Sequence, residues 1–348
     1  MRWRTSALVL LGVMIAAGIS GCVAAPGYQG PATEHFDGKV FRNTLPADKG
    51  VWDLLRLSWG MLRDAESWPG AVDNPVLEGL PPQQNFDGIL TTYVNHSTVL
   101  IQVQGVNILT DPIYSERASP FNFAGPKRVR QPGIPLDALP PIDIILISHN
   151  HYDHLDAQTL VELSNRQDTP PLILAGLGNG AYFAQLGLDN YQDMDWQDVV
   201  DHAGLDIHFV ECRHRSGRGL TDQMQTLWGS FVIGSEAGNI YFAGDTGYGP
   251  HFKQQGAQFG QFALSILPIG AYEPRWFMQD IHLNPADAVQ AHLDLNSRQS
   301  LGIHFGVFQL TFEGIDQPQF DLQGAMQRAE LPAQQFWVLE PGMRRQLH

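Results

Sequence analysis

Three histidines and one aspartate, His149, His151, Asp153 and His154, stand within six residues of this chain. They follow the aliphatic run at 142–147, which predicts a buried strand. Residues at the carboxyl end of such a strand lie where α/β proteins bind ligands. Alternation places His149 and His151 on one side and the other two one turn further, which favours two adjacent metal ions. The alternative, a polar loop with solvated histidines, is disfavoured by this density of ligand-type residues.

Three more ligand-type residues, His214, Asp245 and His304, each follow the end of a predicted strand. The carboxylate of Asp245 can bridge two cations, because each of its oxygens can bind a different ion. Alone, each residue would be read as a structural histidine or a turn residue. Together with the first cluster they complete a predicted two-metal site.

The strand and helix signals predict an α/β fold. Early strands are joined by tight turns, later strands alternate with helices, and Asn284-Pro285 is a helix start. The expected strands are 89–94, 98–103, 106–110, 142–148, 172–175, 206–210, 226–234, 239–243 and 263–267, and the expected helices are 51–63, 156–164, 179–186, 285–293 and 321–330. This order predicts an αββα four-layer sandwich, two sheets between helices, in a single catalytic domain.

Residues 1–21 have the features of a secretory signal peptide: Arg2 and Arg4, an apolar core, and small residues before Cys22. The ending Ile19-Ser20-Gly21-Cys22 resembles a bacterial lipoprotein box, which implies that Cys22 is lipidated and anchors the chain in a bilayer. An ordinary cleaved signal is the alternative. The absence of Asp at 23 resembles lipoproteins that are sorted to the outer membrane, so the expected location is the periplasmic side of the bacterial outer membrane rather than the inner membrane.

Composition separates an N-terminal segment from the main domain and argues against nucleic acid as a partner. Residues 22–84 are rich in Pro, Gly and Trp and predict a lipidated tether and accessory segment, whereas 85–348 predict one hydrolase domain. The apolar face of 51–63 is expected to pack on that domain, with contact to lipid or substrate as alternatives. The formal net charge of −15 argues against binding nucleic acid. The oligomeric state is not predicted.

Beyond these ligands, the chain resembles the metallo-β-lactamase superfamily, and within it the branch of N-acylphosphatidylethanolamine-hydrolysing phospholipase D and its bacterial lipoprotein relatives. The HxHxDH motif with the downstream His, Asp and His marks the superfamily, and the block at 269–278 is specific to the branch. The resemblance covers about 92–309 and includes the motifs at 93–98, 109–112, 125–128, 148–156, 226–230, 242–248, 267–278 and 304–306.

The resemblance implies a role for each ligand. His149, His151 and His214 would hold one zinc ion, Asp153, His154 and His304 a second, and Asp245 would bridge them, with iron or manganese as alternatives. A water between the two ions would lose its proton and attack a phosphodiester phosphorus in line, without a covalent enzyme intermediate. We predict Asp153, Asp245 and His282 as catalytic. Asp153 could orient the attacking water, and Asp245 would bridge the two ions. His282 matches a histidine that the family keeps near the substrate phosphate. A role in fixing its loop is the alternative for His282.

The chain departs from the branch directly after His214, where an aromatic residue is usual and this sequence has Arg215. Arg215 and Arg218 are predicted as substrate contacts, with exposure to solvent as the alternative. His96 is expected to support the site or the fold. The basic residues Lys127, Arg128 and Arg130 are expected to lie on an exposed loop, with a headgroup patch as the alternative.

The predicted function is that of a di-zinc, phospholipase D-type phosphodiesterase acting on N-acylphosphatidylethanolamine-like membrane phospholipids. A zinc hydrolase of a soluble ester such as a lactone is the first alternative, and a noncatalytic envelope lipoprotein is the second. The complete ligand set argues against the noncatalytic alternative. Hydrolysis of β-lactams is not expected, because a fold does not fix a substrate.

Overall fold

The computed structural model describes residues 24–46, 49–75 and 79–348. The predicted signal peptide and Cys22 lie outside the described residues, so cleavage and lipidation stay predictions. Within the described part of the chain, no helix is both long enough and apolar enough to cross a membrane.

The first sheet has seven strands in the order β14-β1-β2-β3-β4-β5-β6. Their bounds are β1 (Ile89–Asn95), β2 (Thr98–Val103), β3 (Val106–Thr110), β4 (Ile144–Ile147), β5 (Leu172–Gly176), β6 (Tyr191–Met194) and β14 (Arg344–Leu347). β14 to β3 pair antiparallel, and β3 to β6 pair parallel. Between β2 and β3, Gln104 and Gly105 both adopt positive φ, +52° and +79°, which produces the predicted tight turn.

The second sheet also has seven strands, in the order β13-β12-β11-β10-β9-β8-β7. Their bounds are β7 (Val199–His202), β8 (Leu205–Val210), β9 (Ser230–Gly234), β10 (Asn239–Phe242), β11 (Phe262–Pro268), β12 (Ser300–Ile303) and β13 (Phe336–Trp337). β7 to β10 pair antiparallel, and β10 to β13 pair parallel. The parallel strands of both sheets therefore bring several strand ends to the same edge.

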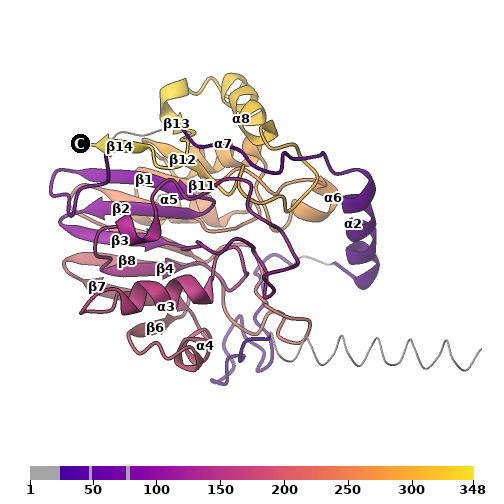
Figure 1. Ribbon diagram of the computed structural model, residues 1–348, viewed down its shortest axis with the longest axis horizontal. Coiled ribbons are helices and arrows are strands. Elements are labelled where there is room, and N and C mark those ends of the chain that lie inside the picture. Colours follow the sequence, from indigo (N-terminus) through magenta and orange to yellow (C-terminus); the bar gives the residue numbers. More distant parts are fainter. Residues whose placement is uncertain (1–23, 47–48, 76–78) are drawn as a thin grey trace, which may run out of the picture.

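Helices cover the outer faces of the two sheets, so the predicted αββα sandwich is confirmed (Figure 1). On the first sheet, buried Leu160 and Phe183 pack beside Ile145. On the second sheet, the ring of Phe252 lies 6.1 Å from that of Tyr241. The helices are α3 (Ala157–Asn165) and α4 (Gly180–Gln185) on the first sheet, and α5 (His251–Phe259), α7 (Pro285–Asp294) and α8 (Gln317–Arg328) on the second, with short 3-10 turns at Leu136–Ala138 and Ala333–Gln335.

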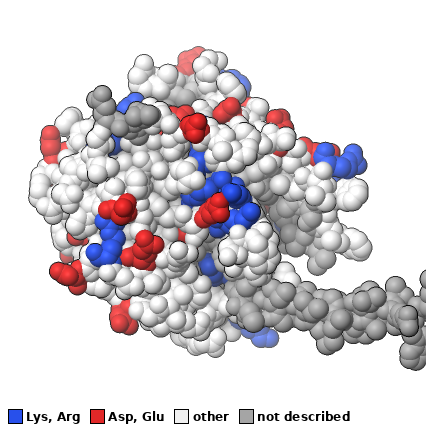
Figure 2. All heavy atoms as spheres, viewed as in Figure 1, with Lys and Arg blue, Asp and Glu red and all other residues white. Residues whose placement is uncertain are grey.

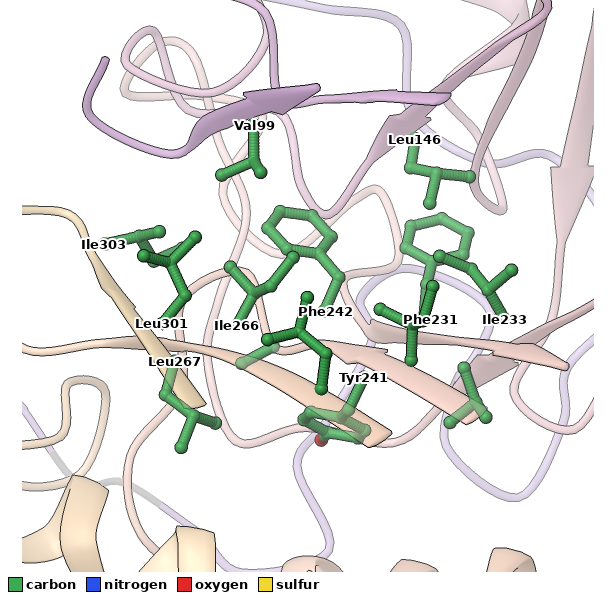
Figure 3. Packing of buried hydrophobic residues seen from close by; sticks show 14 of the residues in the cluster. Val99, Leu146, Phe231, Ile233, Tyr241, Phe242, Ile266, Leu267, Leu301 and Ile303 are labelled. Carbon is green, nitrogen blue, oxygen red and sulfur yellow. The ribbon is translucent and has the colours of Figure 1, made fainter. Parts of the chain in front are cut away.

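The main core lies between the sheets. Figure 3 shows Val99 and Leu146 from the first sheet pointing toward Phe242 and Phe231 of the second. All four side chains are fully buried. Each buried aromatic ring removes roughly 150–250 Å² from water, so this layer supplies much of the driving force that holds the sheets together.

The segment before the sandwich packs against it. Phe36 and Phe41 belong to the main core, and the amide of Phe41 donates to the carbonyl of Met224 at 2.7 Å. Helix α2 (Val51–Arg63) has the predicted bounds and lies at the edge of the sandwich beside α6 (Arg275–Met278) (Figure 1). Residues 24–46 therefore contribute buried apolar side chains to the core of the domain. The predicted domain boundary at 84/85 stays a prediction.

Candidate metal centre

The seven residues predicted as metal ligands converge at one edge of the sandwich. The segment His149–His154 follows β4 of the first sheet, whereas His214, Asp245 and His304 follow β8, β10 and β12 of the second. The carboxyl ends of these strands meet at the same edge, as predicted from the position of the ligand-type residues directly after strands. The site therefore lies between the two sheets and draws ligand-type residues from both.

Three imidazoles form the first donor group. Nε2 of His149 lies 2.8 Å from Nδ1 of His151, and Nε2 of His214 lies 3.3 Å from the same atom. These nitrogens are close enough to share one cation. The grouping is the one expected for the first metal ion.

The second donor group contains Asp153, His154 and His304. Oδ2 of Asp153 lies 3.3 Å from Nε2 of His154 and 3.2 Å from Nε2 of His304. His96, 3.1 Å from the same oxygen, belongs to the same cluster. His96 therefore supports the carboxylate of Asp153 directly.

Asp245 lies between the two groups. Its Oδ2 is 3.1 Å from Nε2 of His154 and 3.2 Å from Nε2 of His304. The same oxygen is 3.9 Å from Nε2 of His149 and 3.8 Å from Nε2 of His214. This position suits a carboxylate shared by two cations.

Hydrogen bonds outside the centre orient three of the histidines. Nδ1 of His154 donates to Oδ2 of Asp111 at 2.6 Å, and Nδ1 of His214 donates to the carbonyl of Ile281 at 2.8 Å. The hydroxyl of Ser148, which donates to Asp111, lies 2.9 Å from Nδ1 of His149. Each bond turns Nε2 toward the centre, as in metal sites that fix the tautomer of their histidines. Sequence reasoning assigned no role to Asp111, although its motif after a strand was part of the family resemblance.

Asn43, from the segment before the sandwich, holds the backbone of His214. Its side-chain amide donates to the carbonyl of His214 at 2.7 Å, and its Oδ1 accepts from the amide of His214 at 3.1 Å. The indole of Trp228 donates to the same Oδ1 at 3.2 Å. Sequence reasoning missed this residue, because no local motif connects two positions 171 residues apart.

The electrostatics of the site suit cations. Burial lowers the pKa of His151 and of His214 to about 3, so both imidazoles are neutral at physiological pH. Burial raises the pKa of Asp245, but the charge on His154 outweighs this and holds it well below its ordinary value. Burial also lowers the pKa of His304, but the Asp245 carboxylate raises it to about 9. Neutral imidazoles and ionised carboxylates are the forms that bind metal, and positive charge is favoured beside the carboxylates.

Unpartnered atoms support the same fit. Oδ1 of Asp245 and Nδ1 of His282 are buried without a hydrogen-bond partner among the described residues. Buried polar atoms are usually satisfied, so these atoms fit coordination to an ion. Imidazole and carboxylate donors suit zinc and also iron and manganese, so the donor chemistry fits two cations without selecting the element.

A cavity of about 330 Å³ opens beside the donors. Arg215 and His282 line it together with His151, Asp153, His214 and Asp245. Nδ1 of His282 lies 3.9 Å from Oδ2 of Asp245, and Nε of Arg215 is buried with no hydrogen-bond partner among the described residues. Both side chains therefore lie on the wall of the cavity, and their contact with a substrate stays a prediction.

Arg218, the other predicted substrate contact, lies elsewhere. It does not line this cavity, and its Nη1 donates to the carbonyls of Asn150 and Leu155 at 3.0 and 2.8 Å. Its guanidinium stacks over the ring of Tyr152 at 3.9 Å. Nη1 of Arg218 thus braces the loop that carries the ligands, whereas its Nε is buried without a hydrogen-bond partner among the described residues. The structure places Arg218 away from the cavity of the metal centre, and its contact with substrate stays a prediction.

The basic residues at 127–130 also differ from expectation. Lys127 is exposed and pairs with Glu116, but Arg128 is buried and its Nη2 donates to the carbonyl of Ile113 at 3.0 Å. Nη1 of Arg130 pairs with Glu340 at 2.8 Å. The expectation of an exposed basic loop is therefore wrong for Arg128, which packs beneath the chain around 113–115.

Comparison with known proteins agrees with this geometry. Residues 106–305 match the Beta-lactamase superfamily domain. The chain is 33% identical over 330 residues to N-acyl-phosphatidylethanolamine-hydrolyzing phospholipase D 1 of Caenorhabditis elegans, covering 88% of this chain and 92% of that protein. It is 34% identical to the mitochondrial enzyme of that name from Saccharomyces cerevisiae, over 68% of this chain and 51% of that protein.

Solved structures share the fold at low sequence identity. A possible metal-dependent hydrolase from Veillonella parvula has a TM-score of 0.60 at 14% identity and covers 75% of this chain and 100% of its own. The metallo hydrolase Igni18 from Ignicoccus hospitalis has a TM-score of 0.57 at 19% identity, covering 75% of this chain and 98% of its own. With its donors gathered at one edge of this sandwich, the chain is a metal-dependent hydrolase that belongs to the metallo-β-lactamase superfamily.

Proposed function

We propose that this chain is a zinc-dependent, phospholipase D-type phosphodiesterase that hydrolyses N-acylphosphatidylethanolamine-like phospholipids. The observation that carries the proposal is the position of Asp245 between two donor groups on the wall of a cavity that also holds Arg215. The 33% sequence identity to the Caenorhabditis elegans enzyme, over 88% of the chain, supports the substrate class.

The cavity has the two kinds of surface that a phospholipid needs. One part is polar and contains the metal donors, Arg215 and His282. Another part is apolar and contains Leu57, Phe277 and Ile281. A phosphodiester would lie against the polar part and the first carbons of an acyl chain against the apolar part, because charged and apolar groups then both find matching surroundings.

Residues of the chain would hold the substrate and the reacting water in place. One cation would be bound by His149, His151 and His214. The other cation would be bound by Asp153, His154 and His304, and Asp245 would bind both cations. When bound, such ions act as Lewis acids and lower the pKa of water. Arg215 would pair with a phosphate oxygen, and His282, 3.9 Å from Asp245, would donate to another. Asp153 would accept a hydrogen bond from the attacking water and orient it.

Activity and metal content should be measured together. Protein stripped of metal and then loaded with zinc, iron or manganese would be incubated with N-acylphosphatidylethanolamine in mixed micelles, and phosphatidic acid would be quantified. We expect zinc to restore its release, and Asp245→Ala to abolish release and reduce bound metal. Asp206→Ala, a change at an exposed position of β8, is the matched control. Turnover of a lactone without phosphatidic acid release would contradict the proposal.

We further propose that a lipid attached to Cys22 holds the enzyme on the periplasmic side of a bacterial outer membrane. The sequence around Cys22 motivates this location. Labelling with palmitate in a bacterial host should be lost in Cys22→Ser. Retained labelling in that variant would contradict the anchor.

A further inference from the structure

Helix α2 presents a stripe of large apolar side chains to solvent. Trp52, Leu55, Trp59 and Leu62 are 82%, 54%, 64% and 83% exposed. Their spacing of three, four and three residues places them on one face of the helix. An apolar face this exposed indicates an interaction site, because single exposed apolar side chains are normally scattered.

The other side of α2 fixes the helix beside the metal centre. Leu57 packs against Phe277 and Ile281 and lines the cavity of the metal centre. The guanidinium of Arg56 stacks over the ring of Trp276 at 4.0 Å. A Cβ at Gly60 would lie 2.3 Å from Cζ of Phe312, so a larger residue there would displace this ring. The apolar stripe is therefore held outward next to the cavity. Figure 1 shows α2 itself at the edge of the molecule.

The segment that contains α2 carries little net charge. Residues 49–64 contain Lys49, Arg56 and Arg63 against Asp53 and Asp64, a formal charge of +1 in a chain of −15. Figure 2 shows basic side chains, with acidic side chains beside them, at the projecting edge where Figure 1 places α2. Lys49 pairs with Asp280 at 3.1 Å, so the helix itself brings little net charge to an anionic surface. Aromatic and aliphatic residues on one face with basic residues nearby are typical of helices that lie in a membrane interface.

We propose that α2 docks in the interface of a phospholipid bilayer through Trp52, Leu55, Trp59 and Leu62. The helix would lie parallel to the membrane and bring the mouth of the cavity to the lipid headgroups. This inference deepens the proposed function, on which its catalytic meaning rests, by stating how a lipid substrate reaches the donors. A second copy of the chain fits less well, because four side chains expose on the order of 500 Å², below the roughly 800 Å² per partner of stable interfaces.

Fluorescence quenching by lipid measures this docking without any turnover. The full chain would be reconstituted in phosphatidylethanolamine–phosphatidylglycerol vesicles with or without bromine atoms on the acyl chains. We expect brominated lipid to quench the wild-type protein, and the quenched fraction to fall at least twofold in Trp52→Phe/Trp59→Phe. Trp337→Phe in β13 is the control and should match the wild type. Equal quenching of the double variant and the wild type would overturn the proposal.

A second variant separates lipid docking from self-association. Leu55→Ser/Leu62→Ser should make Trp52 and Trp59 less accessible to brominated lipid, whereas Phe320→Ser, at a 67% exposed position of α8, should not. Analytical ultracentrifugation in lipid-free detergent should give the same mass for all three proteins. A wild-type dimer that Leu55→Ser/Leu62→Ser converts to a monomer would overturn the proposal in favour of a second copy. An inactive protein that shows the expected quenching would contradict the proposed function alone.

Discussion

Asn43 forms two hydrogen bonds with the backbone of His214, one from its amide to the carbonyl at 2.7 Å and one to its Oδ1 from the amide at 3.1 Å. A segment that precedes the sandwich thereby fixes a residue of the metal centre. His214 follows β8 in an irregular stretch, so its position depends on such bonds more than on a sheet.

Asn43→Ala should weaken metal binding and leave the fold intact. Loss of an interaction that orients a ligand typically lowers metal affinity by about 10–100-fold. The measurement is competition for zinc with a chromophoric chelator, together with the visible spectrum of the cobalt-substituted protein, which reports ligand geometry. Asn190→Ala, which removes one exposed hydrogen bond to Pro170, is the control. Unchanged affinity and spectrum would show that the backbone of His214 holds its place without Asn43.

Asp111→Asn should impair the second donor group. The carboxylate of Asp111 accepts from Nδ1 of His154 at 2.6 Å, and an amide there weakens this charge-assisted bond and its control of the tautomer. We expect about a 10–100-fold loss of metal affinity and a parallel loss of hydrolysis. Isothermal titration of the metal-free protein with zinc would measure the affinity. Two tight binding events in the variant, as in the wild type, would contradict this role.

Arg215→Ala should lower kcat/KM for a phosphodiester substrate by about 10–100-fold, the loss expected for a charge-assisted hydrogen bond worth roughly 1.5–3 kcal/mol. Arg215→Lys should retain part of the activity, because a point charge remains but the planar fork does not. Arg218→Ala should instead lower the free energy of unfolding, since its guanidinium is bonded to backbone carbonyls. Steady-state kinetics and urea denaturation distinguish the two outcomes. Full activity in Arg215→Ala would remove this residue from the substrate site.

Acidification should destabilise the fold in part through His292. Burial lowers the pKa of His292 to about 4, and its Nδ1 lies 2.8 Å from Oγ of Ser300. Between its ordinary pKa of about 6.5 and pH 4 the unfolded chain binds the proton more tightly, so stability falls as pH falls through this window. The contribution is at most about 1.4 kcal/mol per pH unit.

His292→Gln should therefore reduce the slope of unfolding free energy against pH between about 6.5 and 4. Urea denaturation at several pH values in this window would measure the slope. His348→Gln at the exposed end of the chain is the control. An unchanged slope in His292→Gln would show that other buried groups account for the whole effect.

The first three strands were predictable because apolar residues and tight turns define them locally. Strands β6, β7, β13 and β14 were not predicted, since all four are short and lie at the edges of the two sheets. Polar residues such as Asp193, Asp201 and Arg345 also interrupt the apolar pattern of β6, β7 and β14. The expected strand at 226–234 begins only at Ser230, because the residues before it bond outside the sheet: Gly229 donates to the carbonyl of Ser148.

Helix α5 was missed for a related reason. It is rich in glutamine, and Gly256 interrupts its helical pattern. Packing explains that glycine, because a Cβ there would lie 2.2 Å from the carbonyl oxygen of Asp294 in α7. Only the folded structure supplies such a neighbour.

The metal donors of the candidate site were predictable where they follow the end of an aliphatic strand. His149 and His304 directly follow or nearly follow aliphatic strands, and the topology then brings them together. Asn43, Asp111 and the burial of Arg218 were not predictable in the same way, since each depends on a partner distant in sequence. The sequence pattern therefore indicates the metal donors, whereas the residues that orient these donors by hydrogen bonds are identified only in the folded structure.

Because β4 belongs to one sheet and β8, β10 and β12 to the other, neither sheet alone carries a complete set of donors. A nascent or half-folded chain thus has scattered histidines and no hydrolytic centre. Cations that bind across this seam would clamp the halves of the sandwich against each other, so a metal-loaded molecule is also one whose assembly is finished.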